Sequence, residues 1–374
     1  FQVFNANGTA VTAGAFPYND INPGGTGEQN TPLVAALTGG GFALIWDSNG
    51  GPGDVGPAGD AADTYTRVFN NSGAPVSSTI QVNDATLEAD EELPEAIIAL
   101  SGGGYAVVWR DDNELAAADN KDDYYLRVFT AAGVPAGASV MFGDAAHNPL
   151  FQDFNEEYGI AELSNGNIVT CWRTRDDGAT PSPDGHDYGA FFQVFNSSGT
   201  TVAAAAFPYA DINPGGTGEQ NTPLVAALSG GGFALMWDSN GGPGDVGPPG
   251  DVADTYTRVF NNGGGSVSGT VQVNDASLQN DEELPEAIIG LSGGGYAIVW
   301  RDDNELAAAD NKDDYYLRVF TAAGAAVGAS VVFGDAAHNP LFQDFNEEYG
   351  IAELGNGNIV TCWRTRDDGA TPSP

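Results

Sequence analysis

The sequence is poor in positive charge. Its 374 residues include 12 Lys and Arg against 51 Asp and Glu, which gives a formal net charge of -39. Phosphate backbones and anionic membrane surfaces are bound by Lys- and Arg-rich surfaces, so the composition excludes nucleic acid as a natural partner and electrostatic binding to a membrane. The sequence also lacks any run of 18 or more apolar residues, which excludes membrane insertion.

Helical periodicity and the common catalytic motifs are missing too. No window repeats its apolar residues every 3.6 positions between helix caps, so helix should be nearly absent. The three His residues form no recognisable catalytic set, and no GxSxG elbow, HExxH helix, P-loop or CxxC pair is present. Carboxylates are abundant, but nothing in the sequence selects a catalytic pair. The sequence therefore predicts no catalytic residues, no organic cofactor site and no enzymatic activity.

Repetition is what the sequence has in abundance. Residues 1–183 recur as residues 192–374 at a constant offset of 191, and 25 of the 183 aligned positions differ. A shorter period lies inside the long one, because the six tryptophans are 63 to 65 residues apart and close related phrases such as LTGGGFALIW and LSGGGYAVVW. These residues are Trp46, Trp109, Trp172, Trp237, Trp300 and Trp363. The chain therefore contains six copies of a unit of roughly 63 residues.

One unit reads as four strands. In the second unit, residues 95–100 form an apolar run, and SGGG at 101–104 is a tight turn that needs the positive φ of glycine. Two further runs, at 105–109 and 124–129, are rich in β-branched and aromatic residues, and a short one follows at 138–143. Four short antiparallel strands in each of six units are typical of a β-propeller.

The predicted fold is an all-β, six-bladed β-propeller with four-stranded antiparallel blades. Residues 1–374 would form one domain with two near-identical halves, 1–183 and 192–374, joined by a seam at 184–191. The chain begins at a third strand and ends just after a second strand. We therefore expect one blade to be shared between the N-terminal and C-terminal ends, which would remove exposed sheet edges.

The tryptophans and cysteines complete the core prediction. Each Trp should pack between adjacent blades, because it ends an apolar strand; a row of sugar-binding rings is the alternative. Cys171 and Cys362 are copies of each other on opposite blades of the predicted ring, too far apart for a disulfide. Both should be buried free thiols.

Acidic loops between the second and third strands are the candidate metal sites. Calcium prefers six to eight oxygens from carboxylates, Asn side chains and main-chain carbonyls, and these loops alternate such residues with glycine. Dense uncompensated carboxylates also repel one another, which favours a bound cation over a merely solvated loop. Adaptation to saline surroundings is a competing explanation of the same charge. The predicted calcium ligands are Asp47, Asn49, Asp54, Asp111, Asn113, Asp119, Asp122, Asp238, Asn240, Asp245, Asp302, Asn304, Asp310 and Asp313.

A family resemblance covers the whole chain. The phrase VNDATLEADEELPEAIIALSGGGYAVVW, followed by an acidic loop and YYLRVFTAAGVPAGASV, resembles the repeats of large secreted bacterial adhesins and RTX-type calcium-binding proteins. Val82–Asn83, Gly103–Trp109, Val128–Phe129 and Gly133–Gly137 match in order. The nine-residue glycine-aspartate roll of RTX sequences is absent, and the acidic loops are longer. The resemblance implies an extracellular or cell-surface, calcium-dependent repeat protein.

The resulting hypothesis is a secreted, calcium-stabilised structural repeat of an adhesin or filament. It would associate with itself through its terminal half-blades or with neighbouring repeats. The alternative is a lectin-like, glycan-binding propeller, and a less favoured one is an acidic-site glycoside hydrolase or lyase. Aromatic residues beside the acidic loops would stack on sugars in the lectin: Tyr124, Tyr125, Phe151, Phe154 and Tyr158.

Overall fold

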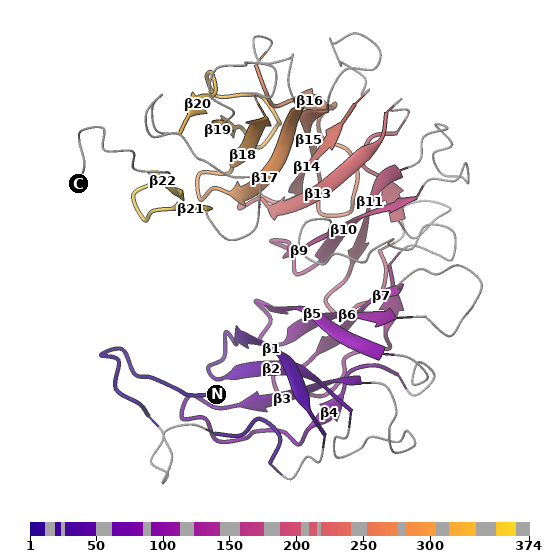
Figure 1. The fold of residues 1–374 in the computed structure, drawn as a ribbon, viewed down its shortest axis with the longest axis vertical. Coiled ribbons are helices and arrows are strands. Elements are labelled where there is room, and N and C mark those ends of the chain that lie inside the picture. Colours follow the sequence, from indigo (N-terminus) through magenta and orange to yellow (C-terminus); the bar gives the residue numbers. More distant parts are fainter. Residues whose placement is uncertain are drawn as a thin grey trace. The chain divides into compact units, whose positions relative to one another are not determined.

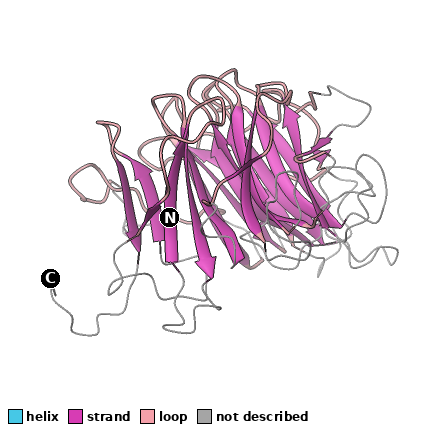
Figure 2. Cartoon of the chain, turned by 90° about the horizontal axis from the view of Figure 1, so that it is seen from above, coloured by secondary structure: helices cyan, strands magenta, loops and turns pink. Residues whose placement is uncertain are grey.

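The described part of the chain is all-β. The computed structural model describes residues 1–11, 19–23, 27–49, 62–84, 91–112, 123–142, 158–175, 188–202, 209–214, 218–240, 253–275, 282–303, 314–333 and 349–363. These residues form 22 strands and no helix (Figures 1 and 2). It follows that none of them forms a helix long and apolar enough to cross a membrane.

The chain divides into two compact units. Unit 1 consists of Phe1–Gln152 and Phe195–Thr201, and unit 2 consists of Asp153–Val194 and Val202–Pro374. The boundary therefore does not follow the 191-residue repeat, because the third repeated segment belongs mainly to unit 2. Each unit is described below by itself.

Unit 1 contains two four-stranded antiparallel sheets, ordered β1-β2-β3-β4 and β5-β6-β7-β8 (Figure 1). The first comprises β1 (Gln29–Ala36), β2 (Phe42–Ser48), β3 (Asp63–Phe69) and β4 (Ile80–Gln81). The second comprises β5 (Glu91–Ala99), β6 (Tyr105–Asp112), β7 (Asp123–Phe129) and β8 (Val140–Met141). These are the four strands that the sequence predicts for each repeat.

Unit 2 contains the corresponding sheets and two more. Its strands are β9 (Tyr158–Glu162), β10 (Ile168–Arg175), β11 (Tyr188–Phe195), β12 (Tyr209–Asp211), β13 (Gln220–Ala227), β14 (Phe233–Ser239), β15 (Asp254–Phe260), β16 (Val271–Gln272), β17 (Glu282–Gly290), β18 (Tyr296–Asp303), β19 (Asp314–Phe320), β20 (Val331–Val332), β21 (Tyr349–Glu353) and β22 (Ile359–Trp363). The first twelve form three four-stranded sheets, whereas β21 and β22 form a two-stranded sheet.

The predicted architecture is confirmed at the level of blade-like sheets. Every four-stranded sheet joins sequence neighbours in an antiparallel meander, as the blades of a propeller do. The count of six four-stranded blades is not confirmed, because the described strands make five four-stranded sheets and one two-stranded sheet. Residues 1–5 belong to none of the described sheets, although Phe4 forms an isolated bridge with Ala10.

Glycine turns connect the first and second strands of each sheet. Gly103 has a φ of 97°, as the sequence predicts for the SGGG turn. At the adjacent Gly104, a Cβ would lie 2.2 Å from the main-chain oxygen of Phe129. The turn therefore requires glycine both for its conformation and for the close approach of the next strand.

Apolar side chains between adjacent sheets form the core of each unit. In unit 1, Val68 and Val82 of the first sheet pack with Tyr105, Val107 and Trp109 of the second. An equivalent cluster lies between the β13–β16 and β17–β20 sheets of unit 2. Five tryptophans are fully buried in these units, as predicted: Trp46, Trp109, Trp172, Trp237 and Trp300.

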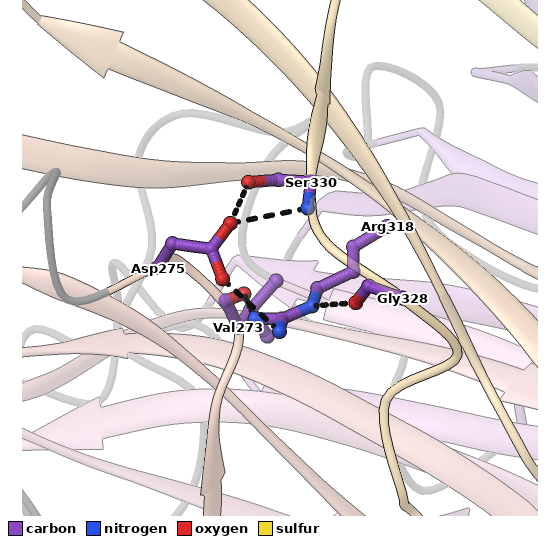
Figure 3. A network of polar contacts seen from close by, with 5 residues as sticks. All are labelled: Val273, Asp275, Arg318, Gly328 and Ser330. Atoms are coloured by element: carbon purple, nitrogen blue, oxygen red, sulfur yellow. Dashed lines mark hydrogen bonds and ion pairs between the residues drawn. The ribbon is translucent and has the colours of Figure 1, made fainter.

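Arginine side chains also tie adjacent sheets together (Figure 3). Arg318 on β19 lies 3.1 Å from Asp275, which follows β16 of the preceding sheet, and donates to the main-chain oxygens of Val273 and Gly328. Both the hydroxyl and the N–H of Ser330 donate to Asp275. Although burial opposes ionisation, these contacts together lower the pKa of Asp275. A charged link therefore joins the two sheets.

The two cysteines differ in exposure. Both are free thiols, as predicted, and Cys171 on β10 is buried. Cys362 on β22 is exposed, so the prediction of two buried thiols is wrong at that position. The reason is tertiary: Cys171 is covered by β13, and its Sγ donates to the main-chain oxygen of Pro223 at 3.3 Å.

Candidate functional site

A bulge in β13 marks the candidate site of unit 2. The register of β13 against β14 shifts between Asn221 and Leu224, and Pro223 lies within this interval. Thr222 has a φ of 49°, a left-handed conformation that is a clear outlier for a β-branched residue. Such a conformation costs about 1–3 kcal/mol and occurs preferentially at functional sites.

Asp238 on β14 lies opposite this bulge. Its Oδ2 accepts a hydrogen bond from Asn221 Nδ2 at 3.3 Å, and the Thr222 hydroxyl also hydrogen-bonds to the carboxyl group. The side chain is 3% exposed, and its Oδ1 has no hydrogen-bond partner among the described residues. A buried acceptor without a partner costs about 1–3 kcal/mol, so a hydrogen-bond donor that reached this oxygen would be favourably bound.

Burial raises the pKa of Asp238 from 3.8 to about 6. Hydrogen bonds from Thr222 and Asn221 oppose the rise, and the negative charge of Glu282 adds to it. The carboxyl group is therefore partly protonated in mildly acidic solution, which suits a proton donor.

Arg173 on β10 orients the amide that holds Asp238. Its Nη1 donates to Asn221 Oδ1 at 2.9 Å. With its oxygen engaged by the guanidinium, the Asn221 amide directs its NH2 group toward the carboxyl group. The chain of contacts from Arg173 through Asn221 to Asp238 fixes one carboxyl oxygen and leaves the other unpaired.

Two neighbours of Asp238 also carry buried polar atoms without partners in the described structure. These are the indole nitrogen of Trp237 and the hydroxyl of Ser239, both fully buried. Most buried polar groups in proteins are hydrogen-bonded, so three consecutive exceptions at the end of one strand call for an explanation. Trp237 and Ser239 point to the opposite face of β14 from Asp238, so a single ligand could not reach all three, and buried water would satisfy these two atoms.

Unit 1 holds a copy of the site with the same local geometry. Thr31 has a φ of 48°, and Asn30 Nδ2 donates to Asp47 Oδ2 at 3.4 Å. Asp47 is also 3% exposed with an unpartnered Oδ1. Among the described residues of unit 1, no arginine contacts Asn30, in contrast to Asn221.

A row of carboxylates lies at the same end of the neighbouring sheet. In unit 1, Glu92, Asp111 and Asp123 occupy directly opposed positions on β5, β6 and β7. Burial raises the pKa of Tyr125, two positions further along β7, and the charges of these three carboxylates add to the rise. In unit 2, burial raises the pKa of Tyr316 to about 12. The negative charges of Asp314, Asp302 and Glu283 add to the rise, and that of Asp314 adds most.

The predicted calcium ligands are only partly described. Asp47, Asn49, Asp111, Asp238, Asn240 and Asp302 lie in or beside strands, whereas Asp54, Asn113, Asp119, Asp122, Asp245, Asn304, Asp310 and Asp313 lie outside the described residues. Asn49 and Asn240 accept hydrogen bonds from the N–H groups of Glu28 and Glu219. Within the described ranges, no group of three or more His, Cys, Asp or Glu residues could hold a metal ion.

The prediction of aromatic residues that stack on sugars is wrong in part. Tyr124 is 1% exposed and packs on Phe142, so it offers no ring face to a ligand. Tyr125 stacks on Trp109 with the ring centres 5.5 Å apart. Phe151 and Phe154 lie outside the described residues.

The sequence interpretation missed Asn221, Thr222 and Arg173. A signal was present, because Pro223 stands inside a run that otherwise reads as a strand. Proline cannot donate to a sheet ladder and so indicates an edge or a bulge. The approach of Arg173 depends on packing between sheets and has no local signature.

Comparisons with known proteins reveal likeness in fold only. No family model matches the chain, and no curated protein matches it. A polysaccharide lyase of family PL25, an ulvan lyase, is 12% identical over 95% of this chain and 79% of its own, with a TM-score of 0.44. An α-L-arabinanase from Penicillium chrysogenum is 10% identical over 81% of this chain and 93% of its own, with a TM-score of 0.39. The α-L-arabinofuranosidase Arb93A from Fusarium graminearum is 11% identical over 80% of this chain and 91% of its own, with a TM-score of 0.39.

These comparisons correct the functional prediction. The three similar structures are named as glycan-cleaving enzymes, and none is named as an adhesin or a filament protein. The predictions that the chain is a calcium-stabilised unit of an adhesin or filament, and that it is not an enzyme, are therefore wrong. Because the identities are low, the likeness assigns neither a substrate nor a catalytic residue.

Proposed function

We propose that the chain binds and hydrolyses neutral glycans, with Asp238 as the acid that protonates the leaving group. The observation that carries the proposal is the Asp238 carboxyl group itself, buried beside a strained residue with one oxygen unpartnered. Glycoside hydrolysis needs one carboxyl group that is protonated at the working pH, and burial creates this property at Asp238.

Glu282 is the proposed second carboxylate. It is exposed at the start of β17, and it is close enough for its negative charge to raise the pKa of Asp238. In this arrangement Asp238 gives its proton to the glycosidic oxygen as the bond to the anomeric carbon breaks. Glu282 accepts a proton from a water molecule as the oxygen of that water bonds to the anomeric carbon and becomes the new hydroxyl group.

The charge of the chain favours a neutral substrate. With a net charge of -39, the protein repels polyanions such as uronic-acid or sulfated polysaccharides at low ionic strength. The unpartnered Oδ1 of Asp238 suits a hydroxyl group of an uncharged sugar.

Glycan binding without cleavage is the second candidate. Asp238 is only 3% exposed, so it reaches a glycosidic oxygen only if its surroundings rearrange. Asn221 and Thr222 are half-buried and are accessible to a sugar without such a movement. A lectin would use these two residues and leave Asp238 as a buried acceptor.

Release of reducing ends from a panel of neutral polysaccharides tests the proposal. The purified chain should release sugar, and the double variant D47N/D238N should lose at least 100-fold of this activity, with D238N and D47N as matched single variants. The result that contradicts hydrolysis is an inactive wild-type chain, or a double variant as active as wild type. Binding measured by calorimetry without any release would support the lectin instead.

We also propose that the six repeats represent six blades, with residues 1–5 and the β21–β22 hairpin as parts of the sixth. Phe1 lies against Phe42 and Phe69 with ring centres 5.3 and 4.7 Å apart. Its copy Phe192, in the third strand of a complete sheet, lies 5.4 Å from Phe233 and 4.6 Å from Phe260. An experimental structure of the chain tests this proposal, and a sixth sheet without residues 1–5 would overturn it.

A further inference from the structure

The first residues of β15 are tied to the first residues of β17, which belongs to the next sheet of unit 2. The hydroxyl of Thr255 on β15 donates to the main-chain oxygen of Glu283 at 2.8 Å, and the Glu283 N–H donates to the main-chain oxygen of Ala253 at 2.7 Å. Thr255 is fully buried, so water does not compete for its hydroxyl. The two bonds therefore fix the main chain of Glu283 and the peptide bond that joins it to Glu282.

This link lies beside the Asp238 carboxyl group. In the pairing of β14 with β15, Thr255 is directly opposite Asp238. Residues opposed in this way have Cα atoms about 4.5–5.5 Å apart and side chains on the same face of the sheet. Glu282 is close enough for its negative charge to raise the pKa of Asp238. One hydroxyl group thus connects the strand pair that carries Asp238 with the segment that carries Glu282.

Electrostatic repulsion acts against this arrangement. Met236, two residues before Asp238, packs in one cluster with Trp300 of the β17–β20 sheet, so the alternation of side chains along β14 directs Asp238 toward that sheet. Three opposed carboxylates lie on the same face of β17, β18 and β19 as Trp300: Glu283, Asp302 and Asp314. Because like charges repel, Glu282 stays near Asp238 only where other contacts hold its main chain in place.

Unit 1 contains the same link. Thr64 is directly opposite Asp47 in the pairing of β2 with β3, and its hydroxyl donates to the main-chain oxygen of Glu92 at 2.7 Å. The Glu92 N–H donates to the main-chain oxygen of Ala62 at 2.7 Å. The link therefore accompanies the buried aspartate in both units.

We propose that Thr255 is a positioning residue of the glycan-cleaving site and sets the separation between the carboxyl groups of Asp238 and Glu282. The inference rests on the proposed function. Thr255 acts through the main chain of β17 and does not touch the substrate. The two carboxyl groups of a glycosidase are about 5–5.5 Å apart when the configuration is retained and about 6.5–9.5 Å apart when it is inverted. A misplacement of about 1 Å can cost about 100-fold in rate, so the link is needed for hydrolysis.

Initial rates of sugar release from a neutral polysaccharide test the inference, in chains that all carry D47N so that only the unit 2 site is active. D47N/T255V should have a kcat at least tenfold below that of D47N and a KM changed less than twofold, and D47N/T255S should restore kcat. The control is D47N/T257V, because Thr257 is also fully buried on β15 and donates to the main-chain oxygen of Leu235 at 2.8 Å. Its kcat should stay within twofold of that of D47N.

Carbon-13 NMR of the Asp238 carboxyl group, identified by its absence from D238N, is the second measurement and does not depend on activity. T255V lets Glu282 move away, so the pKa of Asp238 should fall by at least about 0.5 in T255V and stay unchanged in T257V. An unchanged pKa in T255V, or equal losses of kcat in the T255V and T257V chains, would overturn the inference. A D47N chain that releases no sugar would overturn the proposed function, and the pKa alone then decides whether Thr255 positions the two carboxyl groups.

Discussion

Two strands of one sequence, β1 and β13, have different surroundings. Gln220 of β13 is 1% exposed and Pro223 is buried, whereas Gln29 is half-buried and Pro32 is exposed. The difference lies in β9 and β10, which pack on β13 in unit 2. Burial is therefore a property of the packed sheets, and an identical sequence does not determine it.

Local geometry, by contrast, is the same in the two units. The φ angles of Thr31 and Thr222 differ by one degree, and the Asn–Asp hydrogen bonds measure 3.4 and 3.3 Å. The strained bulge has the same form in both units. We infer that it is encoded by the strand and its pairing partner, while in unit 2 the adjacent sheet adds the contacts of Arg173 with Asn221 and of Cys171 with Pro223.

The largest expected effect distinguishes Val225 of β13 from Val34, its copy on β1. V225D places a charge in the interface with β9 and β10 and should lower the free energy of unfolding by about 3 kcal/mol or more. V34D, at an exposed copy of the same position, should change it by less than about 0.5 kcal/mol. Urea denaturation of both variants measures the difference, and equal losses would show that β1 is covered as β13 is.

The pH dependence of stability is the next effect in size. The raised pKa of Asp238 means that the folded state binds this proton more tightly than the unfolded state. The contribution of Asp238 to the free energy of unfolding is therefore greatest below about pH 4. It falls by about 3 kcal/mol at most as the pH rises from about 4 to about 6. D238N should remove this part of the decline in urea denaturation measured across that range. An unchanged pH profile in D238N would contradict the assignment.

Relief of backbone strain gives a smaller change of opposite sign. T222G and T31G should each raise the free energy of unfolding by roughly 1 kcal/mol, because glycine accepts a positive φ without a steric penalty. T222G should also weaken any activity at the site, since the Thr222 hydroxyl bonds to Asp238. Thermal melts of the two variants check the first point, and a loss of stability in both would show that the bulge is not strained.

The sequence predicted the strands well and the site poorly. Alternating apolar runs between glycine turns identify β5, β6 and β7, because such signals are local. The site depends on contacts between strands far apart in sequence, as between Arg173 and Asn221, 48 residues away. The emphasis on Asp111 and Asp238 as metal ligands followed from composition, which does not reveal that Asp238 is buried beside Thr222.

The smallest expected effect concerns the ion pairs between sheets. Asp84 and Asp275 have matching contacts, with Arg127 at 3.0 Å and Arg318 at 3.1 Å. Both carboxylates are partly exposed, so D84N and D275N should each cost less than about 1 kcal/mol, and less still at high salt. Because the pKa of Asp275 is lowered, its contribution is present near neutral pH and is lost as the solution becomes acidic. Unequal losses in the two variants would indicate that the units differ at this link.

The account depends most on the carboxyl group of Asp238. The most direct measurement is the initial rate of reducing-sugar release from a neutral polysaccharide by wild type, D238N and D47N/D238N, as a function of pH. The account predicts release that declines above about pH 6 in wild type as Asp238 loses its proton, and a loss of at least 100-fold in the double variant. Undiminished hydrolysis by D47N/D238N, with the wild-type pH profile, would contradict it.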